Sequence, residues 1–567
     1  MIAHESAGDR PAAAAPLGVL FAVRSAAALH RLLDLLPVFD GDARVRCRFT
    51  LVPGSAFDAD ALAAVDSSGA RCLSWPEALA RRHDLILAAS PKGELTALRG
   101  PKALLPHGAG FNKALPDEGS PHLPSGLDPA FLLTADERPV ADLHALAHPD
   151  QVTRLAAQCP AAGAAAVVAG DPTLDRILAS LDRREAFRAA LGTGPRRLVV
   201  LSSTWGPESL LARHPDLPTR LSARLPHDAY QLAMVVHPNE YSRSGSFDLA
   251  RRLRPALDAG LVLAGPHEEW AALLVAGDTV VTDHGSTALY AAALDRPVVA
   301  VCDGGAELVP GSPMARLLAA APRLDPSGDD AAAVLAARPT TGTRRFAEAA
   351  FALPGEALAT LGPELYKLLG LVPPPWPTQP RPLASPPGTP STPAAFAVRA
   401  RSCRTADGPV VDVDRLPPWT DLPHHHLAAE YGRAGLHETR SAALLYRRAN
   451  GAPRPDAPRH QEYRTAADWT AEALAGHPAC RTAAVILSPT RCLLRRPTGE
   501  PLALRIAPHR TAGRVRYTDP AAALSAVHAL LSTPHATPPT ALTCRIDGAP
   551  HPLHLTPPTE ADLHHLL

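Results

Sequence analysis

The first part of the chain alternates short apolar runs, rich in β-branched residues, with segments of helical period. Such runs are typical of strands that are buried on both faces of a parallel sheet. The alternation therefore predicts a doubly wound α/β fold. The first set of predicted strands comprises residues 18–23, 45–52, 84–88, 103–105 and 164–169, with helices at 27–36, 61–65, 75–82 and 151–158.

A second alternation of the same kind begins at Arg197, and a polar loop follows most of its predicted strands. Ligands of open α/β sheets bind outside the carboxyl ends of the strands, so we expect these loops to face one ligand site. This set comprises strands at 198–201, 232–236, 261–263, 279–282 and 297–301, with polar loops at Ser202, His237, Pro266 and Asp283.

Residues 278–301 have the pattern of a strand, a polar loop, a helix and a second strand. Gly285 allows the backbone to approach a ligand closely. Ser286 and Thr287 precede the predicted helix 288–294, where a hydroxyl can cap free N–H groups. Since a helix N-terminus attracts anions, this unit suits a phosphate or a diphosphate. An ordinary capped turn between two strands stays open as the alternative.

The two alternations predict two Rossmann-like domains, at residues 16–170 and 171–371, with the crossover near Gly170. Ten prolines between residues 372 and 393 cannot continue a sheet, so residues 372–395 are predicted to be an extended or disordered linker. Residues 396–567 are predicted to form a small α+β module of unknown role, with a helix at 466–474 and strands at 483–487, 492–495, 502–506 and 542–546.

The overall charge excludes some classes of partner. Lys+Arg and Asp+Glu number 56 each, so no global basic field points to nucleic acid, and none is expected as a partner. No Gly-Lys-[Ser/Thr] step occurs, which argues against a P-loop NTPase. Scarce lysine together with abundant alanine and proline suggests a bacterial protein from a GC-rich genome.

The cysteines and histidines predict no metal centre and no cofactor. The eight cysteines include no C-x-x-C pair, which argues against a zinc ribbon and a disulfide framework and favours the reducing cytoplasm. The histidines at 424–426 and 564–565 could bind a metal, but without a second ligand cluster at characteristic spacing they are interpreted as exposed loop and terminal residues. No signal-type segment and no apolar window of about 18 residues is found, so no transmembrane segment is expected, and peripheral membrane contact stays open.

Four loops, taken in order, have a more specific pattern. They are residues 104–110 (Leu-Leu-Pro-His-Gly-Ala-Gly), 170–175 (Gly-Asp-Pro-Thr-Leu-Asp), 203–206 (Ser-Thr-Trp-Gly) with 236–239 (Val-His-Pro-Asn), and 282–287 (Thr-Asp-His-Gly-Ser-Thr). This order resembles the CDP-glycerol glycerophosphotransferase family of teichoic-acid polymerases and, more distantly, the non-hydrolysing UDP-N-acetylglucosamine 2-epimerases. The resemblance covers about residues 16–370 and implies a GT-B fold, a pair of facing Rossmann-like domains.

The resemblance also implies roles for individual residues. The family's first-domain histidine matches His107, followed by Gly108, with Pro106 in place of an aromatic residue and Lys113 one position further along than expected. A nucleotide loop matches Ser203 and Thr204, the second histidine matches His237, and the family's phosphate loop matches Asp283 to Ser286, with Gly285 replacing a serine.

These residues predict a metal-independent transferase that moves a glycosyl or glycerophosphate-type group from a nucleotide-diphosphate donor to an acceptor hydroxyl, in cell-envelope or glycan biosynthesis. His107 is the predicted general base, because its pKa suits proton transfer at neutral pH. His237 is the second predicted catalytic residue, and Asp283 is expected to orient its loop. The predicted donor-phosphate residues are Gly108, Ser203, Thr204, Asp283, Gly285, Ser286 and Thr287, and Pro266 and His267 are predicted to line the base.

Two other functions remain open from the sequence. A nucleotide-sugar isomerase related to the 2-epimerases would need carboxylates for proton abstraction, and Asp84 and Asp117 are its candidates in the first domain. A GT-B protein that has lost catalysis would bind a nucleotide or a glycan and recruit a partner through the C-terminal module. Neither alternative requires a cofactor.

Overall fold

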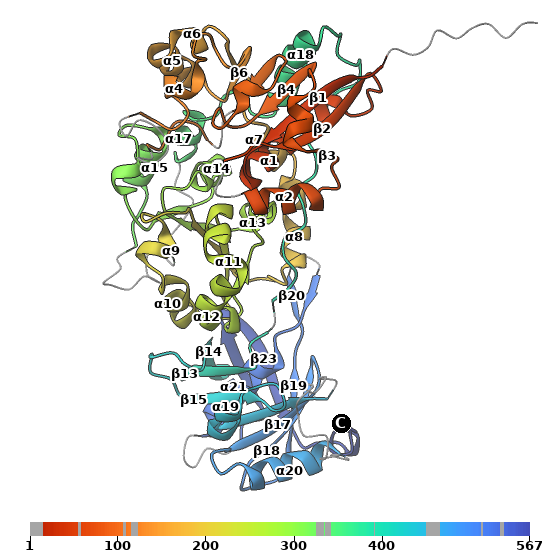
Figure 1. Cartoon of the computed structure of the whole chain (residues 1–567). Coiled ribbons are helices and arrows are strands. Elements are labelled where there is room, and N and C mark those ends of the chain that lie inside the picture. Colours follow the sequence, from red (N-terminus) through yellow and green to blue (C-terminus); the bar gives the residue numbers. More distant parts are fainter. Residues whose placement is uncertain are drawn as a thin grey trace, which may run out of the picture.

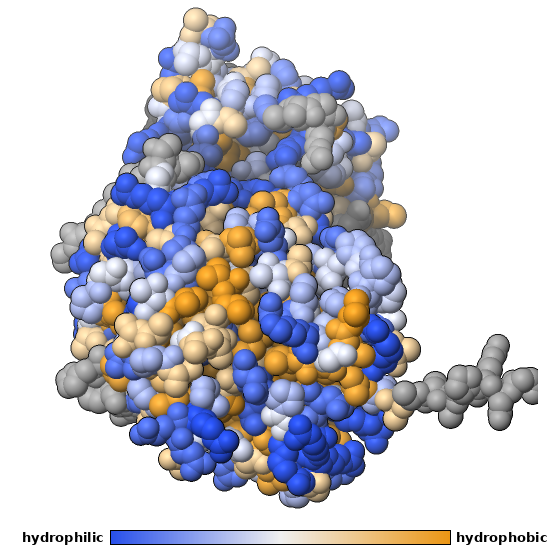
Figure 2. Space-filling model, turned by 90° about the horizontal axis from the view of Figure 1, so that it is seen from above, coloured by the Kyte–Doolittle hydropathy of each residue, from blue (hydrophilic) through white to orange (hydrophobic). Residues whose placement is uncertain are grey.

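The computed structural model describes residues 15–54, 58–105, 109–114, 123–324, 334, 342–390, 392–449, 465–511, 514–532 and 538–567. Figure 1 places a first parallel sheet at one end, a second parallel sheet in the middle and a barrel at the other end. On the face seen in Figure 2, hydrophilic and apolar residues are interspersed and neither class covers the surface alone. None of the described helices is long and apolar enough to cross a membrane.

The first sheet has the strand order β3-β2-β1-β4-β5-β6-β7, and every neighbouring pair is parallel. The order reverses between β1 and β4, which makes that point the topological switch of the sheet. The elements are β1 (Leu17–Val23), α1 (Ala26–Leu33), β2 (Val45–Leu51), α2 (Asp58–Ser67), β3 (Cys72–Leu73), α3 (Trp75–Leu79), β4 (Leu85–Ala88), β5 (Lys102–Leu104), α4 (Pro129–Leu132), β6 (Leu143–Leu146), α5 (Pro149–Gln158), α6 (Pro160–Gly163) and β7 (Ala166–Val168).

The second sheet has the same kind of topology. Its strand order is β10-β9-β8-β11-β12, all neighbouring strands are parallel, and its topological switch lies between β8 and β11. Leu198 and Val200 of β8 face one apolar core, and Val199 and Leu201 face another, so the strand is buried on both sides as its unbroken apolar run predicts. The strands are β8 (Arg197–Ser203), β9 (Tyr230–Val236), β10 (Val262–Leu263), β11 (Thr279–Thr282) and β12 (Val298–Ala300).

Helices cover both faces of the second sheet, as in the doubly wound fold predicted from the sequence. They are α8 (Arg184–Ala190), α9 (Leu210–Arg213), α10 (Leu217–Arg224), α11 (Pro238–Arg252), α12 (Arg254–Asp258), α13 (Glu269–Ala276), α14 (Thr287–Ala293), α15 (Pro313–Ala320) and α17 (Arg344–Glu348).

Two helices join the sheets. Helix α7 (Pro172–Leu178) leads from the first sheet to the second and is capped by Asp171, whose carboxylate accepts from Leu174 N. Helix α18 (Ala357–Leu369) returns, and its Leu361 and Leu365 pack in the core of the first sheet. Residues 357–369 therefore pack with the first sheet, although the sequence assigned them to the domain 171–371.

The proline-rich segment lies against the rest of the protein. Residues 372–390 contain no helix or strand, as expected from their prolines. Arg44 donates to Val372 O at 2.9 Å, Trp376 Nε1 to Asp40 O at 3.2 Å, and Thr389 Oγ1 to Ala190 O at 3.0 Å. The segment thus follows the surface from the first sheet toward the second, rather than acting as a free spacer.

The C-terminal part is a closed barrel with the strand order β13-β14-β22-β23-β19-β18-β17-β16-β15. The sequence predicted a small α+β module, and closure was not predicted. The elements are β13 (Ala395–Thr405), β14 (Gly408–Leu416), β15 (His426–Glu430), α19 (Leu436–Ser441), β16 (Leu444–Arg448), α20 (Ala466–Gly476), β17 (Thr482–Ser488), β18 (Arg491–Arg495), β19 (Leu502–Ile506), the hairpin β20 (His509–Thr511) and β21 (Arg514–Arg516), α21 (Pro520–Leu531), β22 (Ala541–Ile546), β23 (Ala549–Thr556) and α22 (Glu560–Leu563).

The barrel wraps around α21, which is buried along all its length except Leu530.

An ion cluster fixes the barrel to the second sheet. Arg415 of β14 bonds to Asp228, just before β9, at 2.5 and 2.7 Å and pairs with Asp519 at 2.8 Å. Asp519 in turn caps α21 through Ala521 N. Because Arg415 is 1% exposed, this contact is shielded from water.

The joint between the two parallel sheets is organised by Arg176 of α7. Its guanidinium bonds to Asp34 at the end of α1 (3.0 Å) and to Glu268 just before α13 (3.0 and 3.2 Å). It also donates to the carbonyl oxygens of Arg381 and Pro382 in the proline-rich segment, at 3.0 and 2.9 Å. One buried side chain therefore holds both sheets and the segment that runs along them.

Replacing Arg176 with alanine is expected to lower the free energy of unfolding by about 3–5 kcal/mol, because Asp34 and Glu268 would lose their buried partner. Urea unfolding followed by tryptophan fluorescence would measure the change. The matched control is Arg251→Ala, which removes an arginine that is 69% exposed from its pair with Asp248 and should cost about 0.5 kcal/mol or less. Equal effects of the two substitutions would contradict the central role of Arg176.

Candidate active site

A cavity of about 830 Å³ lies between the carboxyl ends of the two parallel sheets. It is lined by the loops at both topological switches, where the fold rule expects a ligand. Loops of the first half and of the second half face each other across it. Of the residues predicted from the sequence, those that line the cavity are Ser203, Thr204, His237, Pro266, His267, Gly285, Ser286 and Thr287.

Asp283 has a different position from these residues. It follows β11, is 0% exposed and does not line the cavity. Its carboxylate accepts hydrogen bonds of 2.8 Å from the backbone N–H groups of Thr204, Leu210 and Gly285. Asp283 therefore joins the loops after β8 and β11 from behind the cavity wall.

The loop after β11 differs in two details from the capped helix start that was predicted. Ser286 adopts helical dihedrals and makes no capping hydrogen bond. Helix α14 begins at Thr287, so both hydroxyl residues stand at the cavity wall. A Cβ at Gly285 would lie 3.1 Å from Asp283 Oδ1 and 3.4 Å from the Cβ of Thr204, so glycine is needed here for internal packing.

Ser203 is the last residue of β8, Thr204 follows it, and the two side chains make different contacts. The Ser203 hydroxyl donates to Thr204 O at 3.0 Å and accepts from Leu211 N at 3.1 Å, so it supports the loop. Thr204 Oγ1 accepts from Lys113 Nζ at 2.9 Å. That bond crosses the cleft, because Lys113 belongs to the first half of the chain.

The loop that carries Lys113 is held by the second half. Ala114 N donates to Glu307 O at 2.8 Å and Val309 N donates to Asn112 O at 2.9 Å, which makes a short antiparallel bridge. The predicted base His107, its neighbour Gly108 and Pro106 lie outside the described residues. The described part of this loop thus joins the two halves beside the cavity.

A histidine and a glutamate form a pair that the sequence reasoning missed. His284 Nε2 lies 2.9 Å from Glu307 Oε2, and His284 is fully buried at the cavity wall. Burial by itself raises the pKa of Glu307, but the hydrogen bond with His284 and the charges of His284 and Lys113 lower it overall. Glu307 therefore stays ionised at neutral pH and fixes the orientation of the imidazole.

The protonation of His237 follows from its backbone contact. It precedes α11, and its Nδ1 accepts from Asn239 N at 3.1 Å, capping the helix. A neutral imidazole that accepts at Nδ1 carries its proton on Nε2. His237 is therefore suited to donate a hydrogen bond through Nε2, and less suited to remove a proton.

The predicted base loop lies against the first half of the chain. Pro266 and His267 line the cavity, and the His267 ring is 5.2 Å from the ring of His30 in α1. Basic side chains that follow β1 and β4 also line the cavity, namely Arg24, Arg31 and Lys92. Sequence reasoning missed them, although the rule that assigned ligands to the ends of the later strands applies equally to the first ones.

Comparison with known proteins places the chain near two groups of solved structures. No protein-family model and no curated protein sequence matches it. The wall teichoic acid polymerase TagF has a TM-score of 0.44 and 11% identity, over 62% of this chain and 89% of TagF. The Neisseria meningitidis UDP-GlcNAc 2-epimerase bound to UDP-GlcNAc has a TM-score of 0.41 and 10% identity, over 62% of this chain and 99% of the epimerase.

A third similar structure is MnaA of S. aureus with UDP, with a TM-score of 0.39 and 11% identity, over 65% of this chain and 100% of MnaA. Both groups that the sequence resembles are thus among the structures similar to this chain. At these TM-scores the similarity is remote. The functional inferences below rest on this chain's own residues.

Asp283→Ala is expected to lower the free energy of unfolding by about 3 kcal/mol, because three buried N–H groups would lose their acceptor and each costs about 1–3 kcal/mol before relaxation. Thermal unfolding of the full chain would measure the change. Asp303→Ala is the control, since Asp303 is exposed and accepts only from Gly305 N at 3.2 Å. A change no larger than that of the control would show that the two loops do not depend on Asp283.

Stability is expected to fall as the pH drops from about 6.5 to about 4, in part through His144 of β6. Burial lowers the pKa of His144 to about 4, against about 6.5 in the unfolded chain. The unfolded state therefore binds the proton first, and the folded state loses stability across this window. Melting temperatures between pH 7.5 and 4.5 should fall less steeply in His144→Gln than in wild type or in the exposed control His564→Gln. Equal slopes would contradict this.

Proposed function

We propose that the chain is a transferase that moves a glycosyl or glycerophosphate-type group from a nucleotide-diphosphate donor to an acceptor hydroxyl. The two parallel sheets act in this proposal as GT-B-like facing domains, close to residues 16–170 and 171–371. The main support for this proposal is the cavity between the two topological switch points. The hydrogen bond from Lys113 Nζ to Thr204 Oγ1 connects its two sides. A site of this kind holds a donor on one side and an acceptor on the other.

The donor diphosphate is proposed to lie against the ends of β8, β9 and β11. A diphosphate needs hydrogen-bond donors and positive charge. The hydroxyls of Thr204, Ser286 and Thr287, the Nε2–H of His237 and the ammonium of Lys113 meet this need at the cavity wall. Because these groups supply the compensation themselves, the transfer is proposed to run without a metal ion.

The nucleotide base is proposed to extend toward Pro266 and His267. Both belong to the loop between β10, an edge strand of the second sheet, and α13. The flat rings of His267 and His30 offer a surface on which a base can stack. The identity of the base is left to the binding experiment below.

The acceptor is proposed to enter from the first half of the chain. Its hydroxyl forms a bond to the transferred carbon or phosphorus, the bond to the nucleotide breaks, and the nucleotide leaves with that electron pair. The hydroxyl proton passes to a base, for which His107 is the candidate from the sequence. Arg24 and Lys92 line this side and favour an acceptor that carries an anionic group.

One of the two carboxylates named for the isomerase alternative lies away from this site. Asp84 accepts from Gly18 N at 2.7 Å, and both residues stand at the amino ends of β1 and β4, opposite the cavity. Asp117 lies outside the described residues. A binding protein without catalysis remains the competing function, and turnover distinguishes it from a transferase.

One nucleoside diphosphate among CDP, UDP, GDP and ADP is expected to raise the melting temperature of the full chain by several degrees at a concentration near 100 times its dissociation constant, which corresponds to about 2.7 kcal/mol. The variant Ser286→Ala/Thr287→Ala should lose this shift, because two of the diphosphate donors are removed. Ser402→Ala/Thr405→Ala, on the exposed end of the barrel strand β13, is the matched control and should keep it.

Activated donors that contain the nucleotide found to bind are then tested in a transfer assay. Turnover by wild type, and its loss in His107→Ala with nucleotide binding intact, would support the transferase. Binding with no turnover of any donor of that nucleotide would instead favour the binding protein. No shift with any of the four nucleotides would contradict the donor site.

A further inference from the structure

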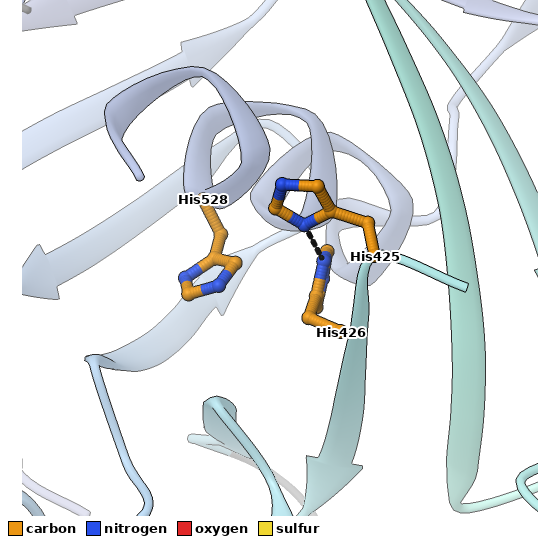
Figure 3. Close-up of side chains that lie close together, drawn as sticks. All are labelled: His425, His426 and His528. Carbon is orange, nitrogen blue, oxygen red and sulfur yellow. Dashed lines mark hydrogen bonds between the residues drawn. The ribbon is translucent and has the colours of Figure 1, made fainter. Parts of the chain in front are cut away.

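Three histidines converge at one end of the barrel (Figure 3). His425 and His426 stand at the start of β15, and His528 belongs to α21. Each offers one ring nitrogen within a group whose members all lie within 4.8 Å of one another. The Nδ1 atoms of His425 and His426 are 3.0 Å apart, and the rings of His426 and His528 are 4.4 Å apart.

This arrangement differs from the exposed loop predicted for residues 424–426. His426 is 5% exposed and His528 is 3% exposed, and only His425 and its neighbour His424 face solvent. The sequence could not reveal the group, because His528 is about a hundred positions away and its side chain is brought to β15 only by the helix inside the barrel. The group is also separate from the cleft, since none of its members lines that cavity.

The rings of His426 and His528 are buried, and their centroids are 4.4 Å apart. A neutral imidazole keeps a lone pair on one nitrogen, and this is the form that binds metals. Two histidines placed this close would repel each other strongly as cations, so the cluster makes chemical sense only for neutral imidazoles.

The hydrogen bonding within the group is incomplete. His426 Nε2 is buried and has no hydrogen-bond partner in the part of the chain that the structure describes. Its Nδ1 faces the Nδ1 of His425, and one proton at most can serve that contact. In either tautomer of His426, Nε2 has no partner among the described residues. A cation bound at the Nδ1 contact would take the place of the single proton that the two Nδ1 atoms can share.

The third ring has a supporting contact of the kind found around metal ligands. Thr482 Oγ1 of β17 lies 2.9 Å from His528 Nδ1, which leaves Nε2 as the nitrogen for coordination. Nε2 has a long contact of 3.4 Å to Ser532 Oγ, whose hydrogen is directed to His528 O at 2.7 Å. Thr482 is therefore a positioning residue that holds the ring in place.

We propose that His425, His426 and His528 bind one divalent transition-metal ion, with Zn²⁺ the best match to three neutral imidazoles. Bond lengths near 2.0–2.1 Å place tetrahedral donors about 3.3 Å apart, close to the separation of the two Nδ1 atoms. His425 faces solvent, so the fourth position would be open to water or to an exogenous ligand. Carboxylate-preferring ions such as Mg²⁺ and Ca²⁺ do not match this donor set.

The expected consequence is a link between the barrel wall and its central helix. His426 is the first residue of β15, and His528 lies in the last turn of α21. One ion bound to both would hold the C-terminal end of the helix to the strand, and binding only to the folded state stabilises it. The proposal is independent of the transferase, because it uses neither the cleft nor the nucleotide.

The test uses the full chain without a histidine tag, stripped of metal and titrated with Co²⁺ and then Zn²⁺. Wild type is expected to bind one equivalent, with visible Co²⁺ absorption typical of tetrahedral nitrogen coordination that Zn²⁺ abolishes. His425→Ala should lower the affinity for Zn²⁺ at least tenfold, and so should His528→Gln. Thr482→Val, which removes only the supporting hydroxyl, should lower it about 10–100-fold.

His424→Ala is the matched control, because His424 is adjacent and exposed but bonds only to Leu422 O, at 3.3 Å. It should bind Zn²⁺ as wild type does. Far-UV circular dichroism would reveal whether His528→Gln disturbs the barrel. If it does, His425→Ala tests metal binding instead, because His425 is exposed. Zn²⁺ binding that is unaffected by His425→Ala, or no binding at micromolar Zn²⁺, would overturn the proposal.

Discussion

The buried ion pairs of Arg176 are the constraint on which the cleft depends. One guanidinium touches the end of α1, the residue before α13 and two carbonyl groups of the proline-rich segment. The neighbouring carboxylate of Asp175 holds Gly355 N and Ala357 N, at 2.6 and 2.7 Å, where the chain returns to the first sheet. The relative position of the two sheets, and with it the width of the cavity, is therefore set by α7 and its charged partners.

The loops around the cavity are held in place by hydrogen bonds between buried side chains and the backbone. Asp283 supplies one carboxylate to three backbone N–H groups, and Gln151 fastens the loop at Ala109 to Ala147 N and Ala350 O. Ser286, Thr287 and His237 lie at the wall of the cavity that these loops form. In the proposed transferase, loops held in this way would preorganise the site for the donor diphosphate.

In the barrel, burial brings histidines together. The helix inside it, α21, buries His528 and packs its ring against that of His426, the first residue of β15. The cluster Asp228, Arg415 and Asp519 fixes the same helix to the second sheet from its other end. The barrel that carries the histidines is therefore joined to the sheet that forms one wall of the cleft.

The sequence by itself determined most strands of the two parallel sheets and the polar loops that follow those of the second sheet. The unbroken apolar runs at 198–201 and 279–282 and the polar residues after them led directly to the second sheet and to the loops at Thr204, His237 and Ser286, because periodicity and local turn chemistry are short-range properties. It did not find β6, where Leu143–Leu146 includes a buried histidine and no β-branched residue. Only the tertiary structure decided that Asp283 faces amides, that Lys113 reaches Thr204, that Glu307 pairs with His284, and that His528 joins His425 and His426, because each depends on contacts between residues far apart in the chain.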